Sequence, residues 1–156
     1  MQERTITTPF GPLRIVTSDV AVVHVWFGAG EGDDSSPLLD QAVAELSEWL
    51  RGERREFTLP LAPQGTPFQL SVWEALRGIP YGETRTYAEL AATVGRPSAS
   101  RAVGAANGRN PLPILVPCHR VIGAGGSLTG FGGGIPVKRW LLAHEQRYAE
   151  RRDRLL

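Results

Sequence analysis

The sequence predicts an α+β protein, with a small antiparallel sheet near its start and a mainly helical unit after it. Two observations support this fold class. Short runs rich in β-branched residues occur at residues 4–27, whereas stretches with apolar residues at helical spacing begin after residue 36. Prolines and a glycine make residues 60–65 a linker by composition. We therefore expect an N-terminal α+β scaffold domain at residues 1–62 and a C-terminal domain at residues 63–156.

Three strands are expected in the N-terminal domain. Residues 5–8, 13–17 and 20–27 alternate or stay apolar, and turn residues separate the runs, which is typical of an antiparallel meander. One more short strand is expected at residues 57–59, where phenylalanine and leucine flank a threonine.

Helices are expected where a capping residue precedes a proline and an apolar stripe follows. Ser36-Pro37 and Thr66-Pro67 both fit, because a hydroxyl side chain caps the first turn and proline suits the first helical position. The expected helices cover residues 37 to about 50, 67–78, 87–94, 98–107 and the stretch from residue 135 onward. The third and fourth are short and joined by a tight Gly-Arg-Pro turn, which is typical of a helix-turn-helix unit and favours DNA binding.

Composition narrows the function classes. The 156 residues carry a formal net charge of +1, so any basic surface for nucleic acid must be local. The single cysteine cannot form an internal disulfide, which points to a reducing compartment, and we expect a cytoplasmic protein. Three scattered histidines give no metal-ligand spacing, so no metal or other cofactor is expected. No stretch is long and apolar enough to span a bilayer.

The single cysteine, Cys118, lies beside His119 in a run unlike an ordinary core strand. The prolines of residues 110–113 disfavour a helix upstream, and the glycines of residues 123–134 let the backbone approach a ligand closely downstream. A thiolate is a good nucleophile, and a neighbouring base can generate it. A free cysteine can also be a small buried hydrophobe. A pocket is favoured here, because a rigid proline-rich segment precedes the Cys-His pair and a glycine-rich segment follows it.

At this run the sequence resembles the O6-alkylguanine-DNA alkyltransferases, also called methylated-DNA–protein-cysteine methyltransferases. The strongest match is Asn-Pro-Leu-Pro-Ile-Leu-Val-Pro-Cys-His-Arg-Val-Ile at residues 110–122. Further matching runs are Gly-Thr-Pro-Phe-Gln at 65–69, Ile-Pro-Tyr-Gly-Glu-Thr at 79–84, Tyr-Ala-Glu-Leu-Ala at 87–91, Ser-Arg-Ala-Val-Gly at 100–104 and Trp-Leu-Leu-Ala-His-Glu at 140–145. The resemblance thus spans residues 65 to 145 in order, and the N-terminal third matches more loosely, chiefly at residues 8–13.

The resemblance implies transfer of an alkyl group from the O6 atom of a damaged guanine to the sulfur of Cys118. It implies that His119 acts as the base through a bridging water, and that Glu145 orients the imidazole. Tyr87 is the implied phenol that donates a proton to N3 of the leaving guanine. Asn110 is the implied brace of the active-site turn. The thioether product is stable, so each molecule is expected to act once. The protein is also expected to be a monomer.

The resemblance also implies double-stranded DNA as the partner, contacted through the minor groove. A guanine inside a duplex cannot present O6 to a buried thiol, so the nucleotide must be flipped out, and Arg101 is implied to fill the gap. Other expected DNA-binding residues are small or basic and lie on or near the second helix of the pair. They are Arg96, Ser100, Ala102, Ala105 and Arg109. The expected substrate-pocket residues are Val121, Phe131, Gly133 and Gly132, the last standing where some relatives carry a hydroxyl residue.

Three alternatives remain at this point. A non-catalytic alkyltransferase-like protein would bind alkylated DNA and mark it for another pathway, but such proteins carry another residue at the position of Cys118. A cysteine hydrolase would need an oxyanion hole, and adjacent nucleophile and base are not typical of one. A helix-turn-helix transcription factor would need a dimer interface or an effector domain, which the sequence does not indicate.

Overall fold

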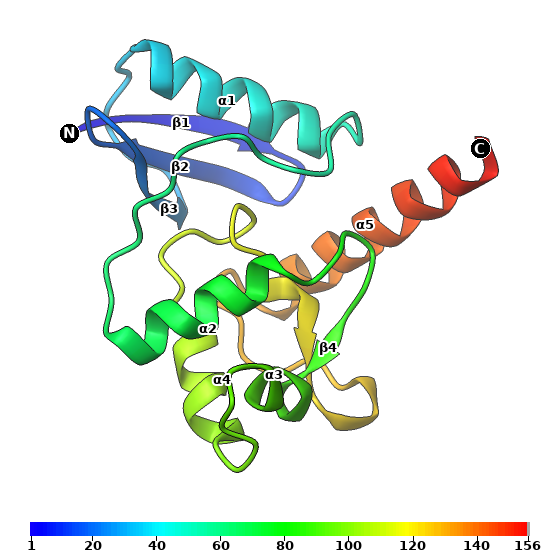
Figure 1. The fold of residues 1–156 in the computed structure, drawn as a ribbon. Coiled ribbons are helices and arrows are strands. Elements are labelled where there is room, and N and C mark those ends of the chain that lie inside the picture. The colour runs from blue at the N-terminus through cyan, green and yellow to red at the C-terminus, as the bar shows by residue number, and fades with distance from the viewer. Residues whose placement is uncertain (156) are drawn as a thin grey trace. The chain divides into compact units, whose positions relative to one another are not determined.

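The structure of the protein, a computed structural model, describes residues 1–155, with side chains through Arg151. The chain divides into two compact units, Met1–Gln64 and the residues from Gly65 onward. A three-stranded antiparallel sheet lies in the first unit and most of the helices lie in the second (Figure 1). The predicted α+β class is therefore confirmed.

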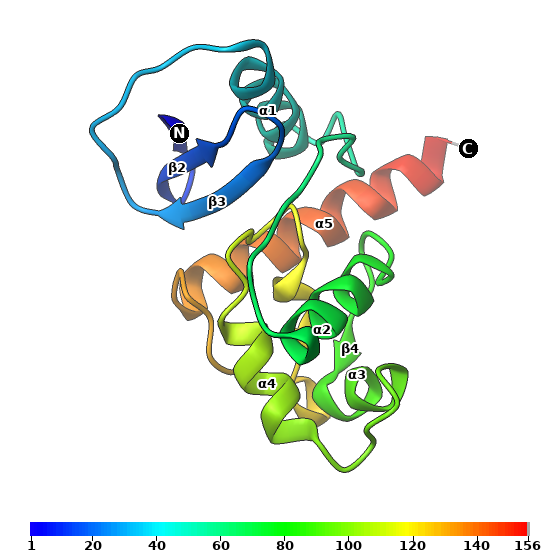
Figure 2. The ribbon, with the colours of Figure 1, turned by 60° about the vertical axis from the view of Figure 1, so that its left-hand side comes forward.

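In the first unit, one helix covers one face of the sheet. The strands β1 (Gln2–Thr8), β2 (Gly11–Thr17) and β3 (Val22–Phe27) pair in that order, and α1 (Pro37–Leu50) packs across them (Figures 1 and 2). Leu13 and Ile15 of β2 alternate toward the core, which α1 closes with apolar side chains spaced by three or four residues. These helix residues are Leu39, Ala42, Leu46 and Trp49. As predicted, α1 begins after Ser36, whose hydroxyl accepts a hydrogen bond from the Leu39 amide.

The strand predicted at residues 57–59 is absent from the described structure, and this prediction is wrong. The main-chain amide of Thr58, which a strand would use for pairing, binds a buried carboxylate instead. Glu45 of α1 accepts from this amide at 2.8 Å and from the Thr58 hydroxyl at 2.6 Å. The chain makes only a single parallel bridge further on, between Leu61 and Val22. Pro60 and Pro63 on either side of Leu61 have no N–H to extend the pairing.

The second unit is built from four helices and one short parallel pair of strands. The helices are α2 (Pro67–Arg77), α3 (Tyr87–Thr93), α4 (Ser100–Gly108) and α5 (Ile135–Leu155), and the strands are β4 (Arg85–Thr86) and β5 (Val121–Ile122). Capping boxes start two of the helices, with Thr66 and Gln69 on α2 and Thr86 and Glu89 on α3. The strand pair was not predicted, and it brings the start of α3 beside the segment that follows Cys118.

One helix boundary differs from the prediction in a way that affects the expected DNA-binding helix. We expected α4 to begin at Ser98, but it begins at Ser100, and no side chain caps it. Pro97 and Ser98 instead occupy the centre of a turn closed by a hydrogen bond from the Ala99 amide to the Arg96 carbonyl. Proline suits this turn position, so Ser98 is used in the turn and not as a cap.

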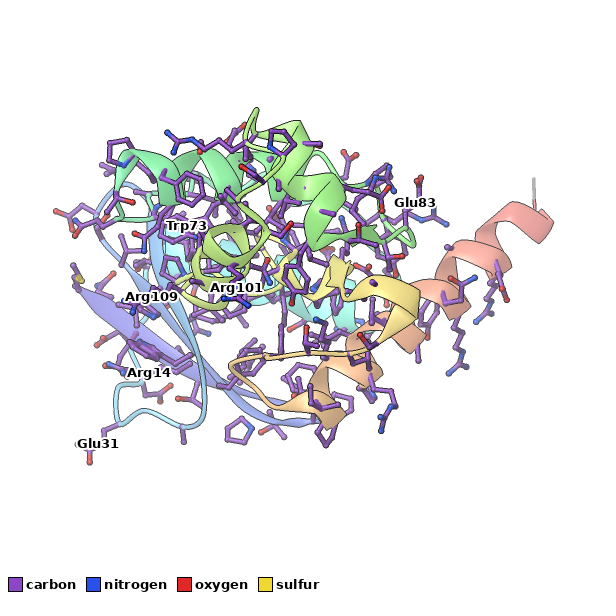
Figure 3. The ribbon with its side chains drawn as sticks, turned by 90° about the horizontal axis from the view of Figure 1, so that it is seen from below. Arg14, Glu31, Trp73, Glu83, Arg101 and Arg109 are labelled. Carbon is purple, nitrogen blue, oxygen red and sulfur yellow. The ribbon has the colours of Figure 1, made fainter. Side chains whose placement is uncertain are left out.

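A buried tryptophan ties α4 to its neighbour α2. The indole N–H of Trp73 donates to the carbonyl of Ala106 at 2.8 Å, and Figure 3 shows Trp73 close to α4. Across residues 1–155, no helix is both long and apolar enough to cross a membrane.

Candidate active site

The segment that carries the cysteine is a braced, strained turn. The side-chain amide of Asn110 donates to the carbonyl of Val116 at 2.9 Å, and its oxygen accepts from the amide of Leu112 at 3.0 Å. Ile114 between them has a φ of 74°, a left-handed conformation that a β-branched residue rarely adopts. A conformation of this kind persists only where surrounding contacts fix it. Asn110 supplies two of those contacts.

Cys118 begins the short 3₁₀ turn η1 (Cys118–Arg120) and is almost fully buried, with 5% of its surface exposed. Its carbonyl accepts a hydrogen bond from the side chain of Asn107 on α4 at 3.3 Å. Burial raises the pKa of the thiol to about 11, although a hydrogen bond with Asn110 and the charge of Lys138 act in the opposite direction. The resting group is therefore a thiol at neutral pH, and a base must remove its proton before the sulfur can attack.

The neighbouring histidine can serve as that base. His119 is fully buried, and its Nε2 lies 3.0 Å from Oε2 of Glu145 on α5. Burial lowers the pKa of His119 more than Glu145 raises it, so the imidazole is neutral at rest. With an Nε2 proton directed at the carboxylate, Nδ1 is the nitrogen whose lone pair can accept a proton.

Arg120 is a residue of this site that the sequence reasoning missed. Its guanidinium makes a forked ion pair with Glu145, at 2.9 Å from Nε to Oε1 and 2.6 Å from Nη2 to Oε2, and donates to the Ile79 carbonyl at 2.6 Å. Burial would raise the pKa of Glu145, but the hydrogen bonds from His119 and Arg120 outweigh burial and lower it to about 2. An arginine inside the apolar run of residues 114–121 was the signal, because a buried arginine requires a partner.

Lys138 of α5 was also missed. Its side chain is fully buried, and its ammonium donates to the carbonyl of Val121 at 2.6 Å and to the carbonyl of Thr129 at 3.1 Å. Burial lowers the pKa of Lys138, and the nearby Cys118 partly opposes this shift. The spacing from Lys138 to Leu141 and Glu145 places all three on one face of α5, which was the available signal.

An open cavity of about 590 Å³ is lined by residues of α3, α4 and the glycine-rich loop that Lys138 anchors at Thr129. It brings together five of the predicted residues, Tyr87, Ser100, Arg101, Phe131 and Gly132. Thr129, which was not predicted, also lines it, and its hydroxyl donates to the phenol oxygen of Tyr87 at 3.1 Å. The residues of α3, α4 and the glycine-rich loop therefore meet at one opening.

Other predicted residues lie outside the lining of this cavity. Cys118 and Val121 are buried, and Gly133 is not among the lining residues. Ala102, Ala105 and Arg109 are exposed on α4 or at its end, and Arg96 in the preceding turn lies over the ring of Phe68 at 5.3 Å. Arg101 and Arg109 come from the two ends of α4 (Figure 3), so arginines flank an exposed surface of small side chains.

Fold and site together define a class of protein: a helix-turn-helix protein that carries a buried cysteine beside a His-Glu pair. The comparison with known families gives the particular one. Residues 67–147 match the model of the 6-O-methylguanine DNA methyltransferase DNA binding domain, and residues 1–63 match that of the 6-O-methylguanine DNA methyltransferase ribonuclease-like domain. The chain belongs to the 6-O-methylguanine DNA methyltransferase family, which confirms the resemblance read from the sequence.

Individual relatives agree with this assignment. The chain is 46% identical over 146 residues to a methylated-DNA–protein-cysteine methyltransferase of Methanosarcina acetivorans, covering 88% of this chain and 94% of that protein. It is 45% identical to the constitutive methylated-DNA–protein-cysteine methyltransferase of Bacillus subtilis, covering 91% and 93%. The crystal structure of Mycobacterium tuberculosis OGT in complex with DNA is similar with a TM-score of 0.87 and 45% identity, over 95% of this chain and 94% of that one.

Proposed function

We propose that the protein repairs DNA by moving the alkyl group of O6-alkylguanine, and of O4-alkylthymine, onto Cys118 in a single displacement. The observation that carries this proposal is the position of the only cysteine, buried directly beside a neutral histidine that a carboxylate holds. The family, and the names of relatives about 45% identical, support the same activity.

The chemistry needs only groups of the chain and the substrate. His119 takes the thiol proton through a bridging water, and Glu145 stabilises the imidazolium that results. The sulfur then attacks the alkyl carbon, so that a C–S bond forms, the C–O6 bond breaks, and its electron pair passes to the purine. Tyr87 donates a proton to N3 of the leaving guanine, and solvent then carries the proton that His119 took from the thiol to the phenolate. The net result moves the thiol proton to guanine and the alkyl group to sulfur.

The substrate must leave the duplex for this to happen. Unstacking and unpairing a base takes on the order of a few kcal/mol, and an inserted side chain can stabilise the gap that remains. Arg101 is suited to this role because it projects from the start of α4 at the edge of the cavity that Tyr87 and Phe131 also line. The exposed alanines Ala102 and Ala105 allow α4 to approach the minor groove closely.

The protein is consumed by its own reaction. A thioether has no good leaving group at neutral pH, and the described site offers no group that would remove the alkyl from sulfur. We infer one transfer per molecule, carried out by a monomer in the cytoplasm, where reducing conditions keep Cys118 as a thiol.

Intact mass spectrometry after incubation with a duplex that contains O6-methylguanine tests the proposal. We expect a gain of one methyl group per molecule, located on Cys118 by peptide mapping, with a burst equal to the protein added and no turnover. The Cys118→Ser variant should bind the same duplex and gain nothing. Tight binding without any mass gain by the natural chain would instead identify a non-catalytic alkylated-DNA-binding protein, and repeated turnover would identify a different kind of enzyme.

A further inference from the structure

We propose that Thr129 is a positioning residue for alkyl transfer, which directs the proton of the Tyr87 phenol toward the leaving guanine. This inference rests on the proposed function and deepens it. The geometry that supports it is the hydrogen bond from the Thr129 hydroxyl to the phenol oxygen, 3.1 Å long, in the wall of the cavity that both residues line.

The ring of Tyr87 is held by the helices, but the helices do not fix its hydroxyl. Tyr87 is the first residue of α3, and its ring lies beside Gly104 of α4, where an added Cβ would stand 3.7 Å from the ring atom Cδ1. Rotation about the C–O bond of a phenol allows the proton to lie on either side of the oxygen. With the Thr129 hydroxyl donating to this oxygen from one side, the phenol proton lies on the other side and is available to the substrate.

Thr129 is itself fixed in an otherwise glycine-rich loop. Its carbonyl accepts from the buried ammonium of Lys138 at 3.1 Å, and the same ammonium holds the carbonyl of Val121 at 2.6 Å. A threonine side chain is branched at Cβ, which restricts its rotation. Because its main chain is anchored and its side chain is restricted, Thr129 holds its hydroxyl at a defined position beside the phenol.

The bond to the phenol oxygen becomes stronger as the reaction proceeds. When Tyr87 transfers its proton to N3, negative charge develops on its oxygen, and hydrogen bonds to charged groups are roughly twice as strong as those between neutral groups. Only an interaction that strengthens in the transition state accelerates the reaction. We therefore expect Thr129 to contribute about tenfold to the rate of transfer and little to DNA binding.

Two substitutions separate the hydroxyl of Thr129 from its shape. Thr129→Val keeps the branched side chain and removes the hydroxyl, and it should lower the single-turnover rate constant on O6-methylguanine duplex about tenfold with unchanged DNA affinity. The rate of transfer from free O6-benzylguanine should fall by the same factor, because the hydroxyl acts in the pocket and not on the duplex. Thr129→Ser restores the hydroxyl and should return the rate to within about threefold of the natural chain.

A double-substitution cycle with Tyr87→Phe decides whether Thr129 acts through the phenol. Adding Thr129→Val to Tyr87→Phe should slow transfer no further, because no phenol remains to be positioned. Additive losses, or failure of Thr129→Ser to rescue, would overturn the inference and show that Thr129 acts by packing in the loop. A faster Thr129→Val variant would also overturn it, because the resting hydrogen bond would then run from Tyr87 to Thr129.

The same series distinguishes this inference from the proposed function. If the natural chain gains no methyl group on Cys118, the proposed function fails, and the inference fails with it. If the natural chain transfers normally and Thr129→Val matches its rate on both substrates, only the role of Thr129 is wrong. Thr129 is exposed at the cavity, and thermal unfolding midpoints of all variants would show that folding is unchanged.

Discussion

The two units of the chain bury their polar side chains in different ways. The first unit buries Thr8, Thr17 and Glu45, whereas the second buries Asn107, His119, Arg120, Lys138, His144 and Glu145. In the second unit, hydrogen bonds, ion pairs or charge link five of these to one another, to Cys118 or to the loop that follows it: Asn107, His119, Arg120, Lys138 and Glu145. Concentrated burial of groups that can exchange or stabilise a proton is the pattern expected of a reactive site, and it supports the proposed role of this unit.

The two buried glutamates show why burial alone does not mark a site. Glu45 and Glu145 have 3% and 1% of their surface exposed, and the pKa of each is lowered because hydrogen bonds outweigh burial. Glu45 is held by the amide and hydroxyl of Thr58 and by Gln41, none of which titrates near neutral pH. Glu145 is held by His119, whose imidazole is a group that can accept a proton and which follows Cys118 directly in the chain. The two carboxylates are therefore alike in burial and differ in their partners, because only Glu145 contacts a side chain that can accept a proton.

Replacing each glutamate by glutamine should produce the largest contrast between the units. Glu145→Gln removes the charge that stabilises the imidazolium of His119, and we expect the rate of alkyl transfer to fall on the order of 100-fold. Glu45→Gln is the matched control in the first unit and should leave the rate unchanged. Single-turnover transfer from O6-methylguanine duplex measures both. Equal rates for the two variants would show that Glu145 acts only as a structural partner of Arg120.

A change at the surface should give the next largest contrast. Arg101→Ala should slow transfer on duplex DNA by about 10- to 100-fold, because only the duplex requires a flipped nucleotide, and should leave transfer from free O6-benzylguanine within about twofold. Arg51→Ala removes the same charge from an exposed position of the first unit, where Arg51 pairs with Glu53, and should alter neither rate. Equal slowing of Arg101→Ala on both substrates would place Arg101 in the pocket or in folding.

Methylation of Cys118 should destabilise the second unit. The alkyl group adds volume to a closely packed site, at about 1–3 kcal/mol for overpacking, and removes a thiol that shares hydrogen bonds, at roughly 1 kcal/mol. Added apolar burial offsets about 0.8 kcal/mol. A net loss of about 1–3 kcal/mol corresponds to a fall in melting temperature of roughly 2–12 °C.

Thermal unfolding of the free and stoichiometrically methylated protein checks this, and the benzylated protein should show a larger fall and faster proteolysis. Hydrogen exchange should locate the change around residues 110–121 and leave α1 unaffected. An unchanged or higher midpoint would mean that the pocket is roomy.

The smallest expected effect tests a polar group with no part in chemistry. The hydroxyl of Thr17 is fully buried and has no hydrogen-bond partner within the described residues. Thr17→Val should raise the free energy of unfolding by about 0.5–1 kcal/mol without changing transfer, because an unpaired buried hydroxyl is unfavourable. Asn107→Leu is the counterpart in the second unit and should lower transfer, because it removes the hydrogen bond to the Cys118 carbonyl. A destabilised Thr17→Val protein would indicate an ordered water bound to the hydroxyl.

Local signals in the sequence predicted most of the fold. Ser36-Pro37 and Thr66-Pro67 mark helix starts with chemistry that acts within one turn, and both predictions are confirmed. The predicted strand at residues 57–59 was wrong because the Thr58 amide binds the carboxylate of Glu45, which is distant in the sequence. The predicted start of α4 at Ser98 was wrong because Ser98 lies in the turn that the Ala99 amide closes. Strands as short as β4 and β5 have no periodicity to detect.

The candidate site was less accessible to pattern alone. The Cys118-His119 pair was visible as a motif, but a role for Glu145 came only from the family resemblance, since an isolated helix carboxylate is usually solvated. Arg120 and Lys138 were missed because their partners, Ile79, Thr129 and Val121 among them, meet them only in the folded chain. Whether a charge is buried depends on contacts between distant residues, which periodicity does not encode.

The anchoring of the loop by Lys138 has a consequence for how freely this protein can change. The ammonium holds main-chain oxygens at Val121 and Thr129, so the anchor does not depend on which side chains the loop carries between them. Side chains between these ends that are not glycine, such as Ala124 and Leu128, can vary in size while the two ends of the loop stay in place, but Gly125 and Gly126 have positive φ and resist substitution. The segment that leads from the cysteine turn to the cavity is thus open to mutation at these positions without loss of the anchor that holds Thr129 in the cavity wall.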